Sequence, residues 1–284
     1  MNVLRTRAEV RSGSTALRAH GARLGLVPTM GALHRGHRAL IRRAVAGNDA
    51  VLVSIFVNPL QFGAGEDLDR YPRTMEADLA MCRAEGVAAV FVPDRATMYP
   101  GGTPDTAVDP GPLGTILEGR SRPGHFGGVL TVVAKLFHLV APGAAYFGEK
   151  DFQQLTLIRA MVRDLDFDLD VVGCPTVREP DGLALSSRNA YLSAADRERA
   201  LTLSRALLAG AGAAADGGPA VLKRAGEVLA AGSGGLPAVD TDYLELCGPD
   251  LGPAPQRGSA RLLVAARVGS TRLIDNVPVT LGEE

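Results

Sequence analysis

The chain has 284 residues, of which 46% are hydrophobic and 21% charged, with 30 basic and 31 acidic side chains. This length predicts two domains or one large one, and either buries a full core without a disulfide or a structural metal. A formal net charge of −1 provides no general attraction to DNA, RNA or anionic lipid, so we expect no nucleic-acid partner and no membrane partner.

The first part of the chain alternates predicted strands with predicted helices. An apolar run over residues 24–27 ends at Pro28, and a turn leads into a helix whose Leu40, Ile41, Ala44 and Val45 share one face. Further helices are predicted at 74–85, 129–140 and 152–165, and further strands at 50–57, 88–92, 144–147 and 169–173. Such alternation predicts an α/β fold with a doubly wound parallel sheet, which binds its ligands beyond the carboxyl ends of the strands.

The pattern changes after about residue 175. A hairpin around Pro180-Asp181-Gly182 is predicted over 176–186, followed by helices near 194–212 and 219–231. A glycine-rich break follows at 232–237, and the chain ends in predicted antiparallel strands at 243–246, 261–268 and 271–275. We therefore expect one domain over 1–175 and a smaller α+β domain over 176–284.

Cysteine content and hydropathy bear on the compartment. Cys82, Cys174 and Cys247 are an odd number and form no CxxC pair, which predicts buried free thiols in a reducing compartment. The first residues are too charged for the apolar core of a signal peptide, and the longest apolar stretch, 129–147, is interrupted by a lysine, a histidine and a proline. We expect a soluble cytoplasmic protein.

The strongest chemical pattern is His34-Arg35-Gly36-His37, which follows a predicted strand and opens a helix. Histidines at i and i+3 share one helix face, and a helix N-terminus favours an anion through its backbone N–H groups and its dipole. Gly36 lets a ligand approach the backbone. The pattern predicts a triphosphate site. The alternatives are a metal site, for which no HExxH spacing or nearby third ligand is evident, and incidental helix residues.

The run Pro28-Thr29-Met30-Gly31-Ala32-Leu33-His34-Arg35-Gly36-His37 resembles the nucleotide-binding segment of the pantothenate synthetase (pantoate–β-alanine ligase) family. That family belongs to the HIGH-motif nucleotidyltransferase superfamily. HxGH alone indicates only the superfamily, whereas four later segments make the resemblance specific and extend it over most of the chain. Arg35 and Arg38 stand where similar enzymes commonly have an acidic or apolar residue, and we expect both to face solvent.

The first of these segments lies at the end of the strand at 50–57, and the second lies just before the helix at 129–140. In Phe56-Val57-Asn58-Pro59-Leu60-Gln61-Phe62-Gly63, two amides just beyond a buried strand are placed to hydrogen-bond a small polar substrate, although Asn58-Pro59 is also a turn signal. The resemblance implies that Gln61 contacts pantoate and the β-alanine site and that Asn58 lines this pocket. The segment from 120 to 128, RSRPGHFGG, predicts by itself a polar loop that caps a helix; by resemblance, Arg122 and His125 face the active site or a subunit contact.

The other two segments carry cations and hydroxyls. Gly148-Glu149-Lys150-Asp151 lies on a strand-to-helix turn, where Lys150 supplies a compact cation for a phosphate; the alternative is a solvated charge cluster. Only three of the 30 basic residues are lysine, so this one is mildly informative. Ser186-Ser187-Arg188-Asn189 resembles a reduced KMSKS segment, which holds a leaving pyrophosphate, although in isolation SSRN suggests a surface loop.

The resemblance implies a Rossmann-like nucleotide- and pantoate-binding domain, a C-terminal lid, a homodimer, and ATP-dependent joining of (R)-pantoate to β-alanine through pantoyl adenylate. Mg²⁺ is expected to be bound mainly by the nucleotide phosphates, and we name no protein ligand for it. The implied catalytic residues are His37, His34, Lys150 and Arg188. The implied pantoate and β-alanine residues are Gln61, Gln154, Asn58 and Met30. The implied ATP-binding residues are Met30, Gly31, Ala32, Leu33, His34, Arg35, Gly36, His37, Gly148, Glu149, Lys150, Asp151, Val177, Leu185, Ser186, Ser187 and Arg188.

Two other functions stay open on the sequence. A nucleotidyltransferase that acts on a phosphorylated acceptor would keep HxGH, but we would not expect it to carry NPLQF and GEKDFQQ together. A non-catalytic nucleotide-binding module is the second alternative, and the presence of His34, His37, Lys150 and Arg188 counts against it. The acceptor that sustains pyrophosphate release distinguishes the first, and loss of turnover in a His37→Ala variant excludes the second.

Overall fold

The computed structural model describes residues 1–63, 65–66, 68–232 and 236–282. The chain divides into two compact units, Met1–Glu149 with Gln153–Pro175, and Lys150–Phe152 with Thr176–Glu284. The main division thus falls at residue 175, where the sequence changes its pattern. The assignment of Lys150–Phe152 to the second unit was not predicted, because local sequence places these residues between a strand and a helix of the first.

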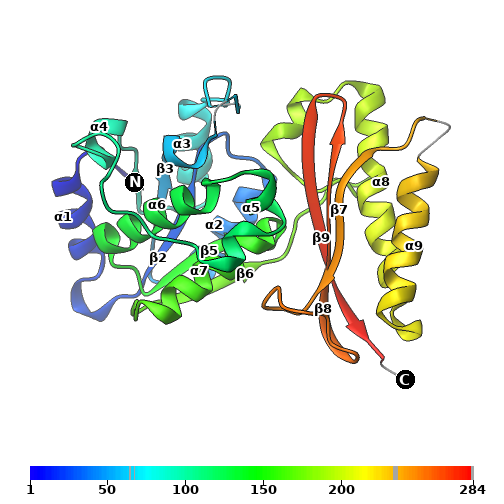
Figure 1. Cartoon of the computed structure of the whole chain (residues 1–284). Coiled ribbons are helices and arrows are strands. Elements are labelled where there is room, and N and C mark those ends of the chain that lie inside the picture. The colour runs from blue at the N-terminus through cyan, green and yellow to red at the C-terminus, as the bar shows by residue number, and fades with distance from the viewer. Residues whose placement is uncertain (64, 67, 233–235, 283–284) are drawn as a thin grey trace. The chain divides into compact units, whose positions relative to one another are not determined.

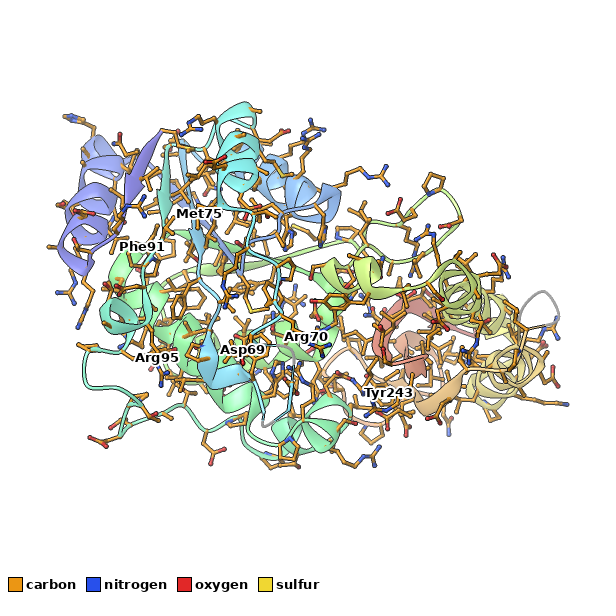
Figure 2. The ribbon with its side chains drawn as sticks, turned by 90° about the horizontal axis from the view of Figure 1, so that it is seen from above. Asp69, Arg70, Met75, Phe91, Arg95 and Tyr243 are labelled. Atoms are coloured by element: carbon orange, nitrogen blue, oxygen red, sulfur yellow. The ribbon has the colours of Figure 1, made fainter. Side chains whose placement is uncertain are left out.

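The first unit is built on a sheet of six parallel strands in the order β1-β4-β3-β2-β5-β6 (Figure 1). The strands are β1 Asn2–Leu4, β2 Leu24–Thr29, β3 Ala50–Ile55, β4 Ala89–Phe91, β5 Ala144–Gly148 and β6 Asp170–Cys174. The doubly wound parallel sheet is therefore confirmed; its short edge strand β1 was missed. Phe91 of β4, labelled in Figure 2, is fully buried.

Helices cover both faces of this sheet. They are α1 Arg7–Leu17, α2 Arg35–Gly47, α3 Met75–Ala84, α4 Arg95–Met98, α5 Glu118–Ser121, α6 His125–Val140 and α7 Phe152–Asp164. Short 3₁₀ turns are η1 Ala19–Gly21, η2 Pro59–Gln61, η3 Pro112–Thr115 and η4 Glu149–Asp151. Apolar residues of α1, α6 and α7 form one core with the sheet, whereas α2 and α3 form the other on the opposite face.

The beginning of α6 corrects one prediction. The helix starts at His125, four residues before the predicted start at 129, so the end of the RPGHFGG segment is helical rather than a polar loop. His125 and Phe126 are buried in its first turn. Gly124, with φ of +83°, turns the chain into the helix in the left-handed region that glycine adopts without strain.

The strand order reverses between β2 and β5, which lie side by side with Leu26 opposite Ala145. The segment after β2 contains His34 and His37, and the segment after β5 contains Glu149. Both leave the sheet at its carboxyl edge at this switch point, which is the usual place for a ligand in an open α/β sheet.

The second unit is a three-stranded antiparallel sheet, β7 Asp240–Cys247, β8 Gly258–Val268 and β9 Thr271–Leu281. Helices α8 Ala194–Ala211 and α9 Gly218–Ala231 lie together along one face of it (Figure 1), and η5 Ser187–Tyr191 and η6 Ala214–Asp216 are short turns. Of the predicted break at 232–237, residues 233–235 lie outside the described residues. β9 continues six residues past its predicted end because Pro278 sits on an edge strand, where a missing N–H is tolerated.

Cys82 and Cys174 are buried, and Cys247 is only partly buried, which corrects the expectation for that thiol. Burial together with the nearby Asp78 carboxylate raises the pKa of the Cys82 thiol to about 11, so this thiol stays protonated near neutral pH. Within the described part of the chain, no helix has the length and apolar character needed to cross a bilayer.

Candidate active site

The two histidines of the HxGH motif cap α2 and stack on each other, with ring centroids 4.1 Å apart. His34 is the N-cap residue: its Nδ1 accepts from the Gly36 amide at 3.1 Å, and its own amide donates to His37 Nδ1 at 3.3 Å. A backbone N–H only donates, so Nδ1 of each ring is an acceptor and the neutral ring carries its proton on Nε2. Each imidazole is therefore an Nε2–H donor at the N-terminus of a helix, an arrangement suited to phosphate oxygens.

The turn before these histidines is held by Asp78 of α3, a residue that sequence reasoning missed. Its carboxylate accepts from the amides of Ala32 at 3.0 Å and Leu33 at 2.8 Å and from the Thr74 hydroxyl at 3.0 Å, and its side chain is 2% exposed. The turn needs this support because Ala32, a non-glycine residue, has φ of +50°. The spacing of Asp78 and Cys82, four residues apart on the buried face of α3, is the sequence signal that could have found it.

Asn58 is the centre of a buried group of amides beyond β3. Its Nδ2 donates to the Gly128 carbonyl at 3.0 Å, and its Oδ1 accepts from the Leu60 amide at 3.3 Å and from the Tyr99 hydroxyl at 2.7 Å. The carbonyl only accepts and the amide only donates, so the orientation of the Asn58 side chain is determined. The close approach also requires Gly128, since a Cβ there would lie 2.1 Å from the Leu60 carbonyl oxygen.

The orientation of Asn58 in turn orients Gln61. Asn58 Nδ2 donates to Gln61 Oε1 at 3.0 Å, so the Gln61 amide presents its NH₂ group on the other side, toward Met30 Sδ at 3.1 Å. The structure thus brings together three of the four predicted substrate residues and shows Gln61 as a donor, which suits a carboxylate or hydroxyl oxygen. Tyr99, which was not predicted, is buried, and burial raises the pKa of its hydroxyl, which therefore stays a donor.

Arg122 and His125 hold the main chain of Gln61. His125 Nδ1 lies 2.8 Å from the Gln61 carbonyl oxygen, and Arg122 Nη2 donates to the same oxygen at 3.3 Å. Arg122 also forms two bonds to the Glu66 carboxylate, at 2.6 and 2.8 Å. Burial, the largest single effect, raises the pKa of Glu66, but the hydrogen bond and charge of Arg122, with smaller contributions from the Gly63 backbone and His125, together hold that pKa below its ordinary value. Arg122 and His125 therefore hold the main chain of Gln61, the predicted substrate residue, in place.

The two glutamines after the GEKD segment have different surroundings. Gln153 is buried, and its amide bonds the carbonyls of Leu113 and Ile116 at 2.7 and 2.9 Å and the Glu118 amide at 3.0 Å. It therefore ties the 113–118 segment to α7. Gln154, the predicted substrate residue, is half-buried on α7. Gly148 ends β5, and Glu149, Lys150 and Asp151 form η4.

In the second unit, the predicted hairpin leads into the Ser-Ser-Arg segment. The Leu185 amide donates to the Val177 carbonyl at 3.0 Å, which pairs the two predicted ATP-binding residues of the hairpin, and Arg178 bridges with Ala184. Ser186 caps η5, where its hydroxyl oxygen accepts from the Arg188 amide at 3.2 Å. The hairpin prediction is confirmed, and Ser187 and Arg188 lie in the first turn of η5.

The two arginines that depart from the family pattern differ. Arg35 is exposed, as expected. Arg38 is partly covered, because its Nε lies 3.1 Å from Glu85, which Arg42 also pairs at 2.6 Å. These pairs connect α2 to the end of α3 and lower the pKa of Glu85, chiefly through the hydrogen bond from Arg42. Among the described residues, no three His, Cys, Asp or Glu side chains form a cluster that could hold a metal ion.

A doubly wound parallel sheet whose donor side chains gather beyond β2 and β3 at the carboxyl edge defines the class of Rossmann-like α/β proteins that bind anionic ligands there. Sequence comparison specifies the family. The model of the family described as pantoate-beta-alanine ligase matches residues 2–278, and the chain belongs to this family.

Curated relatives and solved structures agree. A protein of Nocardia farcinica named pantothenate synthetase is 62% identical over 275 residues, which are 97% of this chain and 85% of the relative. A protein of the same name from Rhodococcus jostii is 64% identical over 269 residues, which are 95% of this chain and 85% of the relative. The crystal structure of pantothenate synthetase from Thermus thermophilus has a TM-score of 0.90 at 51% identity and covers 98% of this chain and 99% of its own. The pantoate-beta-alanine ligase from Francisella tularensis, complexed with beta-gamma ATP and β-alanine, has a TM-score of 0.80 at 34% identity. The match covers 98% of this chain and 97% of that chain.

Proposed function

We propose that this protein joins (R)-pantoate to β-alanine with ATP, through a pantoyl-adenylate intermediate, releasing AMP and pyrophosphate. The observation that carries the proposal is the pair of capping imidazoles, His34 and His37, each with an Nε2–H donor at the N-terminus of α2. Membership of the pantoate–β-alanine ligase family and the relative complexed with beta-gamma ATP and β-alanine support it.

Two steps follow from the chemistry of a carboxylate, which has no good leaving group. A pantoate carboxylate oxygen attacks the α-phosphorus of ATP, and the bond from that phosphorus to the bridging oxygen breaks as pyrophosphate leaves. The neutral β-alanine amine then attacks the acyl carbon, the bond from that carbon to the oxygen shared with phosphorus breaks, and AMP leaves with that oxygen. The nitrogen loses one proton and keeps the other as the N–H of the pantothenate amide. The residues supply positioning and charge stabilisation, and no covalent enzyme intermediate is needed.

We assign the residues as follows. His34 and His37 donate to the phosphates as charge develops on them, with His37 the nominal proton donor to the departing oxygen. Gln61 donates to pantoate, with Gln154, Asn58 and Met30 lining the same pocket. Lys150, Ser186, Ser187 and Arg188 hold the β- and γ-phosphates. Mg²⁺ enters on the nucleotide, with phosphate oxygens as its main ligands. A homodimer in the cytoplasm completes the proposal.

Pyrophosphate–ATP isotope exchange tests the first step. Purified protein is given ATP, Mg²⁺ and labelled pyrophosphate without β-alanine, with and without pantoate. Exchange that requires pantoate is expected, and addition of β-alanine should then produce AMP and pantothenate in equal amounts. Measurable ATP binding without pantoate-dependent exchange would contradict the adenylate step, and a panel of other acceptor acids would then be tested.

A Tyr99→Phe variant should weaken pantoate binding without affecting ATP. The substitution removes the hydroxyl that donates to Asn58 Oδ1 and so loosens the amide pair that orients Gln61. Loss of one buried neutral hydrogen bond is worth about 1 kcal/mol, so KM for pantoate should rise about three- to tenfold while KM for ATP stays unchanged. Steady-state kinetics with each substrate varied measure this. Equal changes in both KM values would show that Tyr99 acts only through the general fold.

A further inference from the structure

Two adjacent residues of β9, Asp275 and Asn276, bind the two phosphate-binding segments that we propose for the second unit. Both are buried, with 4% and 3% of their surface exposed, and Asn276 lies 126 residues from Lys150 in the sequence. Neither was singled out by sequence analysis. The contacts of each lead to a different segment.

Asp275 holds the hairpin that leads into Ser186. Its carboxylate makes a two-point pair with Arg178, with Nη1–Oδ2 at 2.6 Å and Nη2–Oδ1 at 2.9 Å. Arg178 also donates to the Gly182 carbonyl at 3.1 Å, so the guanidinium spans the hairpin turn. A paired guanidinium and carboxylate in this fork geometry define both distance and angle. The base of the Ser-Ser-Arg segment is thereby tied to one position on β9.

Asn276 holds the main chain of Lys150. Its Nδ2 donates to the Lys150 carbonyl at 2.8 Å, and its Oδ1 accepts from Arg261 Nε at 2.7 Å. One partner only accepts and the other only donates, so this amide has one orientation. The Arg261 guanidinium also lies over the Phe152 ring, 4.1 Å from its centroid, which gives the Lys150–Phe152 segment a second attachment to β8.

The geometry of a strand explains why neighbouring residues reach two separate segments. Successive side chains point to opposite faces, and Asp275 shares its face with Leu273 and Val277, which pack in the core with α8 and α9. Asn276 therefore lies on the other face, as does Arg261, whose cross-strand partner is Pro278. One dipeptide thus fixes the hairpin from one side of the sheet and Lys150 from the other.

We propose that Asp275 and Asn276 are positioning residues for ATP: they fix the positions of Lys150 and the Ser186–Arg188 segment relative to each other. This inference rests on the proposed function, because it takes its meaning from the phosphate contacts assigned to Lys150 and Arg188. Stability alone is a weak explanation for the arrangement, since a buried guanidinium, carboxylate and amide are generally no more stabilising than apolar residues of the same volume.

The test is a double-mutant cycle read by calorimetric titration with Mg·ATP, which needs no acceptor. Asn276→Leu keeps the branched shape of the side chain and adds no charge, but it removes the bond to the Lys150 carbonyl and the bond from Arg261. Loss of the bond to the Lys150 carbonyl should raise the Kd for ATP about tenfold, equivalent to about 1.4 kcal/mol. In a Lys150→Ala background, the same substitution should change the Kd less than about twofold, because the positioned side chain is already missing.

A matched control comes from the same strand. Arg272→Gln breaks the ion pair with Asp242, at 2.7 Å, next to Tyr243 of β7, which is labelled in Figure 2. It should leave the Kd for ATP unchanged. Asn276→Ala adds no bulk, so it provides a second measurement if the leucine variant does not fold. It should give the same tenfold effect.

Equal losses of ATP affinity in both Lys150 backgrounds, or an unchanged Kd in Asn276→Leu and Asn276→Ala, would overturn the positioning role. Failure of the proposed function has a different result: no pantoate-dependent pyrophosphate exchange in the unmodified protein. The calorimetric cycle is independent of that outcome because it contains neither pantoate nor β-alanine.

Discussion

Replacing His37 with asparagine should lower the rate of pantoate-dependent pyrophosphate exchange about 10²–10³-fold, the usual cost of removing one donor that stabilises developing charge. In the unmodified protein the His34 amide lies 3.3 Å from His37 Nδ1. Asparagine Oδ1 occupies the place of that ring nitrogen and can still accept from the His34 amide. The variant therefore keeps the cap of α2 and loses the distal Nε2–H donor together with the ring contact to His34. The midpoint of thermal unfolding should stay within about 2 °C of the parent, since His37 is only half-buried and the helix cap is kept.

His37→Gln is the matched variant, because its Nε2 lies at about the same distance along the side chain as the lost imidazole nitrogen. It should retain more exchange activity than His37→Asn, although the longer chain no longer caps the helix. An exchange rate in His37→Asn within a few-fold of the parent would show that the distal nitrogen has no role in the adenylate step.

Asp78→Ala should reduce both stability and activity, because it releases the turn that presents the histidines. The substitution leaves the amides of Ala32 and Leu33 without their acceptor, and Ala32 keeps its unfavourable φ of +50°. Buried donors left without partners cost about 1–3 kcal/mol each, so we expect the free energy of unfolding to fall by about 2–6 kcal/mol. Urea unfolding measures this loss, and kcat/KM for ATP should fall about 100-fold, as for other misplaced catalytic groups.

Two further variants separate the effects of Asp78 from those of its helix. Glu76→Ala changes an exposed carboxylate in the same first turn of α3 and should leave kcat/KM for ATP unchanged. Asp78→Asn retains one acceptor oxygen and should fall between the parent and Asp78→Ala in both measurements. A normal kcat/KM for ATP in a folded Asp78→Ala protein would show that the turn does not need this carboxylate.

Patterns of a few neighbouring residues led to most residues of the candidate site. His34 and His37 could be found because the motif is short and lies at a strand-to-helix junction, where the backbone itself favours an anion. Asn58 and Gln61 could be found for a similar reason, since both follow the end of a buried strand. By contrast, Tyr99 lies 41 residues from the Asn58 that it orients, and no local pattern connects the two.

The second unit shows the same limit more strongly. Asn276 lies 126 residues from the Lys150 carbonyl that it binds, and Asp275 lies 97 residues from Arg178. The predicted last strand ended at residue 275, whereas β9 continues to Leu281. The position of β9 at the sheet edge makes Pro278 acceptable within it.

The sequence by itself determined the alternation of strands and helices, the change of pattern near residue 175, and the motifs at the strand ends, because hydrophobic periodicity and turn chemistry depend on near neighbours. Tertiary structure alone decided which buried polar residues support those motifs: Asp78 at the histidine turn, Tyr99 at the amide pair, and Asp275 with Asn276 at the hairpin and at Lys150. A buried polar group needs a partner wherever the fold brings one, so its role is set by spatial contacts rather than by the residues beside it in the chain.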